Sequence, residues 1–294
     1  MKIELLSVIV PVYKKQKTIE KELQDLSEVL GRTNYKYEII AVVDGTSLDN
    51  SYEEAKRTDS SKIRIYGYKK NYGKGQAVRY GMQKAKGDVI TFIDSGGDIN
   101  PQGIIMLLEH MKWYNADIIV GSKLHSASKV NYPFKRKILT YGYYLFVKLL
   151  FGLKIRDTQT GLKAYKREVL EKVLPRLVVK RFAFDIEILA VANYLGFKKI
   201  FDAPVEVDMD FSESSIVGLF TNNGVWNFAY DTLAVWYRMH ILNYYMDRNN
   251  RINVYDEDLQ MYVNTGDMKN RKQSIINLVN KSFPQFIKLK KQND

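Results

Sequence analysis

The sequence contains no cysteine and only three histidines among its 294 residues. The absence of cysteine excludes disulfide bonds, thiolate-bound metals and cysteine nucleophiles. The histidines, His110, His125 and His240, are scattered along the chain, which argues against a histidine-based zinc site. Any metal ion would therefore have to bind oxygen ligands.

Long apolar runs are also missing. The best candidates for a transmembrane helix are residues 138–153 and 224–246. Charged side chains interrupt both, and neither contains about 18 consecutive apolar residues. The apolar run near the start is too short and too β-branched for a signal peptide. We therefore expect no transmembrane span and no signal peptide. The predicted location is cytoplasmic, with the protein peripheral on the cytoplasmic face of a membrane.

Positive charge is abundant and unevenly spread. The formal net charge is +12, and residues 123–181 hold fifteen Lys or Arg against three acidic residues. An aromatic content of 13% argues against a disordered chain. A basic block of this kind suits nucleic acid, an anionic membrane or a phosphorylated substrate, and a solvated lysine-rich surface is the plainer alternative.

The first half of the chain alternates strand and helix patterns. Predicted strands are Leu6–Val12, Tyr37–Val43, Ile63–Tyr68 and Asp88–Ile93, and predicted helices are Thr18–Leu30 and Gln76–Lys86. Such alternation indicates an α/β fold with a mostly parallel sheet flanked by helices. Ligands of these sheets bind beyond the carboxyl ends of the strands.

The second half is predicted to continue this fold and to end in amphipathic helices. The expected elements are helices 101–114 and 182–195, strands 117–120 and 199–207, an aromatic-rich amphipathic stretch 136–151, a long helix 223–246 and a weak helix 273–280. We expect a catalytic domain over 1–222 with a basic amphipathic insert at about 129–155. Residues 223–294 would form a C-terminal helical segment that suits a membrane interface, followed by a polar tail. Stripes that simply face the core are the alternative.

Carboxylates follow two of the predicted strands. Asp44 and Asp94 come directly after buried runs, and the turn Asp94-Ser-Gly-Gly-Asp98 can aim two carboxylates at one Mg²⁺ or Mn²⁺. Asx turns that cap the loops are the structural alternative. The Gly73-Lys-Gly75 sequence has neither P-loop nor dinucleotide spacing, so it indicates phosphate contact by Lys74 only weakly.

Four stretches occur in a specific order: Val8-Ile-Val-Pro-Val-Tyr13, Val42-Val-Asp-Gly-Thr-Ser-Leu-Asp49, Asn71-Tyr-Gly-Lys-Gly-Gln-Ala77 and Gly87-Asp-Val-Ile-Thr-Phe-Ile-Asp94. In this order and spacing the chain resembles family 2 glycosyltransferases of the Rossmann-like GT-A fold over residues 5–240.

Motifs in the second half narrow the resemblance. Gly121-Ser-Lys123, Arg156-Asp-Thr-Gln-Thr-Gly-Leu-Lys163 and Lys180-Arg-Phe-Ala-Phe-Asp-Ile-Glu187 look like those of polyprenyl-phosphate sugar synthases. The residues of these motifs resemble those of the dolichyl-phosphate β-glucosyltransferases more closely than those of the mannose synthases. The resemblance implies an inverting hexosyltransferase with a UDP-sugar donor, glucose first, and a polyprenyl or dolichyl phosphate acceptor.

The resemblance also implies roles for individual residues. Nucleotide-sugar binding would fall to Pro11, Tyr13, Asp44, Lys74, Asp94 and Ser95. Catalysis around the donor sugar would fall to Asp94, Asp157, Gln159 and Asp185, with Glu187 structural because residues two apart on a helix point in different directions. Acceptor phosphate binding would fall to Lys123, Arg136 and Thr140. The metal, Mg²⁺ or Mn²⁺, would be held by Asp94 and Asp98.

The sequence departs from the family pattern at two places. The usual Asp-x-Asp metal motif reads Asp94-Ser95-Gly96, and the usual Asp-Asp-Gly-Ser of the nucleotide pocket reads Asp44-Gly45-Thr46-Ser47. We expect Asp98 to replace the missing metal ligand, since two carboxylates with diphosphate and water complete an octahedron. Weaker dependence on metal, or a degenerate site, are the alternatives.

Other functions stay open at this point. The chain could be a GDP-mannose-dependent polyprenyl-phosphate mannose synthase, a family 2 enzyme with a protein or glycan acceptor, or a sugar-nucleotide-binding protein without turnover. We expect no nucleic-acid partner, because only the charge favours one. The expected partners are the donor, the lipid phosphate and an anionic membrane surface, and the sequence predicts no oligomeric state.

Overall fold

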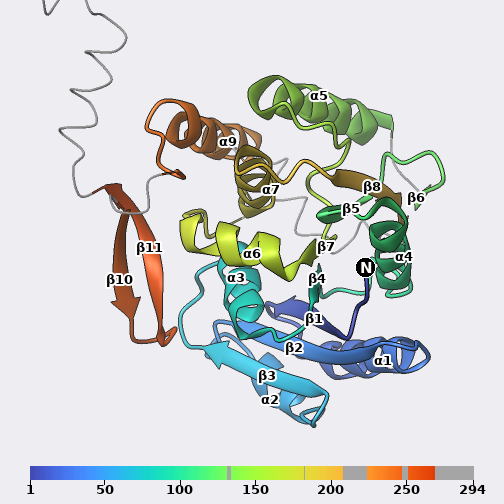
Figure 1. Cartoon of the computed structure of the whole chain (residues 1–294). Coiled ribbons are helices and arrows are strands. Elements are labelled where there is room, and N and C mark those ends of the chain that lie inside the picture. Colours follow the sequence, from blue (N-terminus) through green and yellow to red (C-terminus); the bar gives the residue numbers. More distant parts are fainter. Residues whose placement is uncertain (131–133, 182, 208–223, 247–250, 269–294) are drawn as a thin grey trace, which may run out of the picture.

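The computed structural model describes residues 1–130, 134–181, 183–207, 224–246 and 251–268, apart from the side chains of helical residues 134–139 and 224–227. Its centre is a seven-stranded sheet with the order β3-β2-β1-β4-β7-β5-β8 (Figure 1). The strands are β1 (Leu5–Val12), β2 (Lys36–Asp44), β3 (Ile63–Tyr68), β4 (Val89–Ile93), β5 (Ile118–Ser122), β7 (Leu162–Lys166) and β8 (Ile200–Pro204). Neighbours pair in parallel except β7, which is antiparallel to both β4 and β5.

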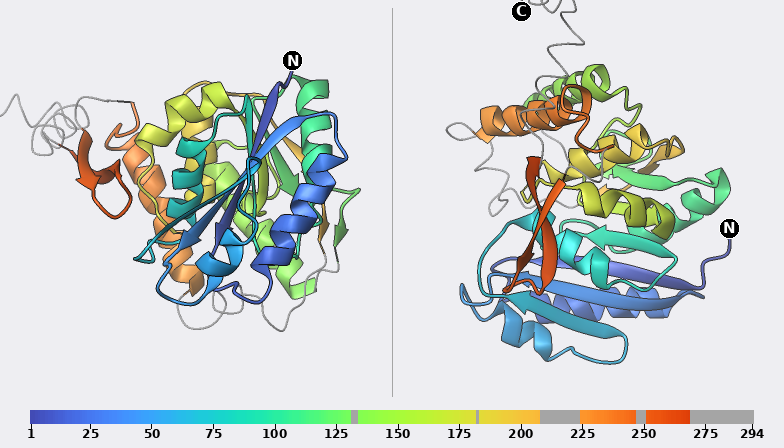
Figure 2. Two further views of the ribbon diagram at one scale, coloured as in Figure 1. Left: turned by 90° about the horizontal axis from the view of Figure 1, so that it is seen from below. Right: turned by 60° about the vertical axis from the view of Figure 1, so that its left-hand side comes forward.

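Helices cover both faces of this sheet (Figure 2). They are α1 (Ile19–Gly31), α2 (Ser51–Lys56), α3 (Lys74–Lys84), α4 (Gly103–Tyr114), α5 (Phe134–Phe151), α6 (Arg167–Val173), α7 (Phe184–Tyr194) and α9 (Gly224–His240), with a 3₁₀ turn at Leu174–Arg176. Alternate side chains of β1 enter different cores. Ile9 packs with α3, α6 and α7 on one face, whereas Val8 and Val10 pack with α1 and α4 on the other. The sheet is therefore buried on both sides, as its near-continuous apolar strands require.

The mostly parallel α/β architecture expected from the sequence is confirmed. Strand β7 and helix α6 lie in a region for which no element was predicted, because Lys163 and Lys166 interrupt its apolar pattern. The predicted helix 223–246 ends earlier, at His240. The weak helix predicted at 273–280 and the start of the predicted helix at Phe182 lie outside the described residues.

A β hairpin occupies part of the region predicted as polar tail. Its strands are β10 (Arg251–Asp256) and β11 (Met261–Met268), and a second small pair joins β6 (Lys129–Val130) to β9 (Glu206–Val207). The β10–β11 turn reaches the loop after β3, where Asp258 accepts hydrogen bonds from the backbone N–H groups of Lys69 and Lys70 at 3.2 and 3.3 Å. The hairpin therefore fastens a loop of the N-terminal half (Figure 2).

Helices α5 and α9 lie side by side at one end of the molecule (Figures 1 and 2). The hydroxyls of Tyr143 and Thr232 are 3.1 Å apart, and the Tyr143 and Phe228 ring centroids are 4.9 Å apart. Each helix also presents apolar side chains to solvent: Tyr141, Leu145 and Leu149 on α5, and Tyr230, Leu233 and Tyr237 on α9. No helix in the described part of the chain combines the length and the apolar character needed to cross a bilayer.

The buried amide of Asn264 joins the hairpin to the rest of the fold. It accepts a hydrogen bond from the Tyr244 hydroxyl and donates one to the Arg176 carbonyl at 3.1 Å. Asn264→Ala removes both of these buried hydrogen bonds, so we expect the free energy of unfolding to fall by about 1–3 kcal/mol. Urea denaturation measures this loss. The exposed hairpin residue Asn253 provides the control, since Asn253→Ala should leave the unfolding free energy unchanged; equal losses in both variants would contradict the assignment.

Candidate active site

The predicted site residues converge at the carboxyl ends of β2, β1 and β4. Asp44 ends β2 and Asp94 follows β4, with β1 between these two strands. Because β7 runs antiparallel, the segment that precedes it, residues 157–161, reaches the same edge as Asp94. Helix α7 brings Asp185 to this edge from the side.

Asp44 organises the loop that leads into α3. Its buried carboxylate accepts the backbone N–H groups of Tyr72 and Gly73, both at 2.8 Å. Burial raises the pKa of Asp44, and these two hydrogen bonds oppose the rise. Pro11 lies at the end of the neighbouring strand β1, and its carbonyl accepts a hydrogen bond from the Ser95 hydroxyl at 2.7 Å. The ring of Tyr13, just beyond this strand, is exposed.

Four charged side chains alternate in sign across the site. Lys74 Nζ lies 2.8 Å from Asp94 Oδ2 and 3.6 Å from Asp185 Oδ2. The opposite oxygen of Asp185 lies 2.6 Å from Nζ of Lys163, a side chain that is fully buried. The order is therefore Lys163–Asp185–Lys74–Asp94, and we call it the ion chain.

The two lysines of the ion chain differ in their electrostatic environment. Burial would lower the pKa of Lys74, but Asp185 and Asp94 outweigh burial and raise the pKa above its ordinary value. For Lys163 burial prevails and lowers the pKa, although Asp185 opposes it. Lys74 is thus held firmly as a cation beside the Asp94 carboxylate.

Gly161 lets β7 approach Asp94 closely. The Asp94 N–H donates to the Gly161 carbonyl at 2.9 Å. A Cβ atom at position 161 would lie 1.9 Å from Asp94 Oδ2, so any larger residue would displace the carboxylate. The glycine is therefore required for the position of Asp94.

Asp157 forms a second cluster. It accepts the Thr160 hydroxyl at 2.6 Å and the backbone N–H groups of Lys123 and Gln159, each at 3.1 Å. Lys123 Nζ lies 3.5 Å away. Burial opposes ionisation of Asp157, but Lys123 and these hydrogen bonds prevail and lower its pKa. Asp157 thus remains a carboxylate that holds Lys123 at the site edge.

The remaining predicted residues differ in what the structure shows. Glu187 turns away from the ion chain and accepts hydrogen bonds from the Val178 and Val179 backbone and the Tyr245 hydroxyl. Thr140 lies half-buried on α5, and the Arg136 side chain lies outside the described residues. The acceptor roles of Lys123, Arg136 and Thr140 stay predictions.

Sequence reasoning gave no role to Lys163. The residue stands in a quoted motif, but a lysine in a short strand gives no sign of complete burial. Its partner Asp185 lies 22 positions later, so the contact depends on tertiary structure.

The surroundings of Asp94 show whether this carboxylate is placed to hold a divalent ion. Asp94 Oδ2 is bound by Lys74, and the buried Asp94 Oδ1 accepts no hydrogen bond from a described residue. An ion on Oδ1 would face the ammonium that the same carboxylate already binds, and like charges repel. Among described residues no three His, Asp or Glu side chains gather into a metal-binding group. This set does not fit a tightly held divalent ion, and the role of Asp98 as a ligand stays a prediction.

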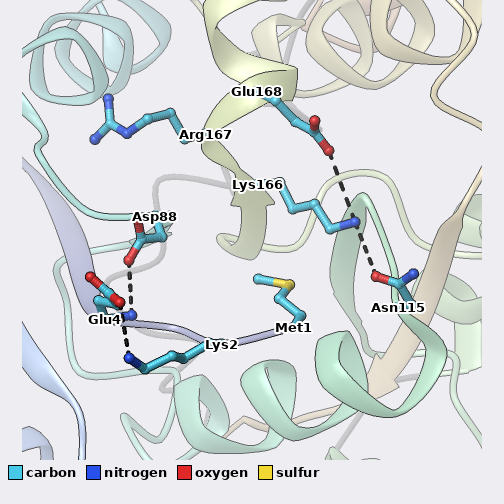
Figure 3. A pocket seen from close by; sticks show the side chains of 8 residues that line it. All are labelled: Met1, Lys2, Glu4, Asp88, Asn115, Lys166, Arg167 and Glu168. Atoms are coloured by element: carbon cyan, nitrogen blue, oxygen red, sulfur yellow. Dashed lines mark hydrogen bonds and ion pairs between the residues drawn. The ribbon is translucent and has the colours of Figure 1, made fainter.

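An open hollow lies at the opposite edge of the sheet (Figure 3). Residues that precede strands, such as Glu4 and Asp88, line it together with Lys166. The Asp88 carboxylate accepts the Glu4 backbone N–H at 2.8 Å, and Lys166 Nζ lies 3.3 Å from Asn115 Oδ1. These groups bind one another, and none of the predicted site residues lines the hollow.

Comparison with known proteins identifies relatives. Residues 7–174 match the family described as "Glycosyl transferase family 2". A "Dolichyl-phosphate beta-glucosyltransferase" of Dictyostelium discoideum is 35% identical over 209 residues, which cover 65% of this chain and 63% of the relative. A "Dolichol-phosphate mannosyltransferase" of Pyrococcus furiosus is 31% identical over 203 residues, which cover 67% of this chain and 55% of the relative. The chain thus spans about 63% of the length of the glucosyltransferase relative.

The fold is also similar to solved structures. Glucosyl-3-phosphoglycerate synthase of Mycobacterium tuberculosis, solved with Mn²⁺, UDP-glucose and phosphoglyceric acid, superposes with a TM-score of 0.58. The two sequences are 14% identical, and the match covers 89% of this chain and 86% of that chain. The likeness confirms the GT-A fold expected from the sequence.

Asp202, on β8, should make stability depend on pH. Its Oδ2 accepts the Arg156 backbone N–H at 3.1 Å, and its buried Oδ1 has no hydrogen-bond partner among described residues. Burial, aided by the charge of Asp157, raises the pKa of Asp202 from 3.8 to about 6. The folded protein therefore binds more protons than the unfolded chain between these values, and its stability falls as pH rises through them.

We expect Asp202→Asn to remove this ionisation. The variant should melt at a higher temperature than the wild type above about pH 6, with the gain disappearing near pH 4. Thermal melts across this range measure the difference. The exposed Asp59→Asn change should give no such gain, and a gain for Asp202→Asn that is independent of pH would contradict the interpretation.

Proposed function

Because the chain belongs to glycosyltransferase family 2, we propose that it transfers a hexose, glucose first, from a UDP-sugar to a polyprenyl phosphate such as dolichyl phosphate. The observation that carries the proposal is the ion chain at the carboxyl ends of the strands, where Lys74 stands between Asp94 and Asp185. The name of the Dictyostelium discoideum relative supports glucose and the dolichyl phosphate acceptor.

The reaction we propose inverts the anomeric carbon. An oxygen of the acceptor phosphate forms the new bond to that carbon, and the bond to the diphosphate breaks, so that UDP leaves with the electron pair. A phosphate is already anionic near neutral pH, with a second pKa of about 6, so the reaction needs no strong general base. It needs positioning and charge neutralisation instead.

The site residues would divide these tasks. Lys74 would neutralise the leaving diphosphate, while Asp94 and Asp185 fix its ammonium between them. Asp185 and Asp157, with Gln159, would contact the donor sugar. Asp44 would support the nucleotide pocket, because it holds the loop at Tyr72 in place.

The acceptor phosphate would bind at Lys123, with Arg136 and Thr140 as further donors. The observation that supports Lys123 is its attachment to Asp157, which leaves a cation at the edge of the site. The divalent ion, Mg²⁺ or Mn²⁺ on Asp94 and Asp98, remains a prediction. Mn²⁺ in the mycobacterial synthase supports it, whereas the ion pair of Asp94 with Lys74 opposes it.

The exposed stripes of α5 and α9 support a membrane surface as partner. Leu149 is 84% exposed and Tyr230 73% exposed, on neighbouring helices, beside the exposed Lys148. Aromatic and aliphatic side chains next to lysine suit the interface of an anionic bilayer. We propose that these two helices bring the site to its lipid acceptor, with the protein peripheral on the cytoplasmic face.

One alternative donor has a specific observation in its favour. The similarity to a "Dolichol-phosphate mannosyltransferase" of Pyrococcus furiosus supports GDP-mannose with the same acceptor class. The chemistry at the phosphate would be unchanged, so only the donor distinguishes the two functions.

A transfer assay tests the proposal. Radiolabelled UDP-glucose or GDP-mannose is incubated with the protein and polyprenyl phosphate, and label is counted in the organic phase. We expect label from UDP-glucose, and a decrease of about 100-fold or more in Asp94→Ala, because the change removes the group that fixes Lys74.

Each other outcome has its own meaning. Label from GDP-mannose alone would correct the donor and keep the mechanism. Transfer to a protein or glycan only would contradict the lipid acceptor. UDP binding without any transfer would contradict the enzyme and favour the sugar-nucleotide-binding protein.

Vesicle binding tests the membrane surface. We expect Leu149→Glu to weaken binding to phosphatidylserine-containing vesicles about tenfold, since burying one leucine contributes about 1.5–3 kcal/mol. Co-sedimentation measures the bound fraction. The control is Trp113→Glu on α4, which removes an equally exposed apolar side chain from another face. Equal effects of the two changes would contradict the assignment of α5 to the membrane.

A further inference from the structure

The loop that should hold a metal lies against the start of α1. The Ser95 hydroxyl is bonded to the end of β1, and the Gly96 N–H donates to Glu22 Oε2 of α1 at 3.0 Å. Gly96 has φ +139°, a conformation that side chains with a Cβ rarely adopt. The loop is therefore fixed with a bare backbone at the position where the family motif has its second carboxylate.

Lys15 points to this bare position. A Cβ atom added to Gly96 would lie 3.4 Å from Lys15 Nζ. The Lys15 backbone is anchored, since its N–H donates to Ser51 Oγ at 2.7 Å and its carbonyl accepts the N–H groups of Thr18 and Ile19, both at 3.0 Å. An ammonium group thus stands beside position 96, where the motif would place a carboxylate.

Lys15 differs from the other lysines of the site in its ion pairs. Lys74, Lys163 and Lys123 each lie within ion-pair distance of a carboxylate. Lys15 forms no ion pair with any carboxylate in the described ranges of the chain, and the nearby Glu22 is bonded to the Gly96 backbone. Its positive charge is therefore available to an anion that enters beside Asp94.

On the basis of the proposed nucleotide-sugar function, we propose that Lys15 binds the diphosphate of the donor together with Lys74. The two ammonium groups supply the positive charge that a divalent ion brings where the motif has both carboxylates. Binding of UDP by this chain then requires no divalent ion. In this chain Lys15 therefore stands beside the position at which the motif has its second carboxylate.

Calorimetric titration of the purified protein with UDP and with uridine tests this inference. Titrations are run in EDTA and in Mn²⁺, with the wild type, Lys15→Met and Lys17→Met. Lys17 lies two positions further on the same segment and is exposed, so its change removes an equal charge away from Gly96. Uridine lacks the diphosphate and reports the base pocket alone.

We expect the wild type to bind UDP equally well in EDTA and in Mn²⁺. Lys15→Met should weaken UDP binding in EDTA about tenfold or more, as the loss of a charge-assisted contact does, and leave uridine binding unchanged. Lys17→Met should bind UDP like the wild type. Retained uridine binding also shows that the Lys15→Met variant is folded.

Two results would overturn the inference and leave the proposed function intact. One is UDP binding by the wild type that EDTA abolishes and Mn²⁺ restores, and the other is UDP binding by Lys15→Met that equals that of Lys17→Met. Binding of neither UDP nor uridine in any buffer would instead contradict the UDP-sugar donor itself, and the inference with it.

Discussion

Pairing of buried charge is the constraint on which the site depends. Lys163 is fully buried in β7, and an unpaired ion at such a position would cost several kcal/mol. Asp185 of α7 meets this requirement and binds Lys74 with its other oxygen. Lys74 in turn binds Asp94 after β4. Four separate elements therefore take up one arrangement, in which the cation beside the reaction centre is oriented before substrate binds.

The antiparallel direction of β7 makes this arrangement compatible with an otherwise parallel sheet. It begins at the edge where the parallel strands end, so Asp157 and Gly161, which precede it, reach the same region as Asp94. Strand β7 supplies the buried cation Lys163, and the segment before it supplies the close approach at Gly161 and Asp157, which holds Lys123. A parallel strand at this place would carry the same residues to the opposite edge.

The sequence predicted the features that depend on local residue patterns and on the order of the motifs. Continuous β-branched runs identified the strands before Asp44 and Asp94, and the topology of parallel sheets then placed both carboxylates at one edge. Strand β7 was missed because burial of Lys163 depends on Asp185, a contact that no local pattern encodes. The hairpin was missed for a similar reason: its polar strands are held by contacts such as that of Asn264 with the Arg176 carbonyl, 88 positions earlier.

The contact between Asp258 and Lys69 joins positions 189 residues apart in the chain. On the ribosome, the segment up to Pro204 already contains all seven strands of the central sheet and the Asp44 carboxylate that binds the Tyr72 backbone. The second attachment of this loop, from the Tyr72 hydroxyl to Asp256 of the hairpin, is still missing at that stage. Contacts of such long range form slowly, because the loop they close is entropically unfavourable. The chain should therefore acquire its full ability to bind nucleotide only after the hairpin has been synthesised, although the central sheet can form much earlier.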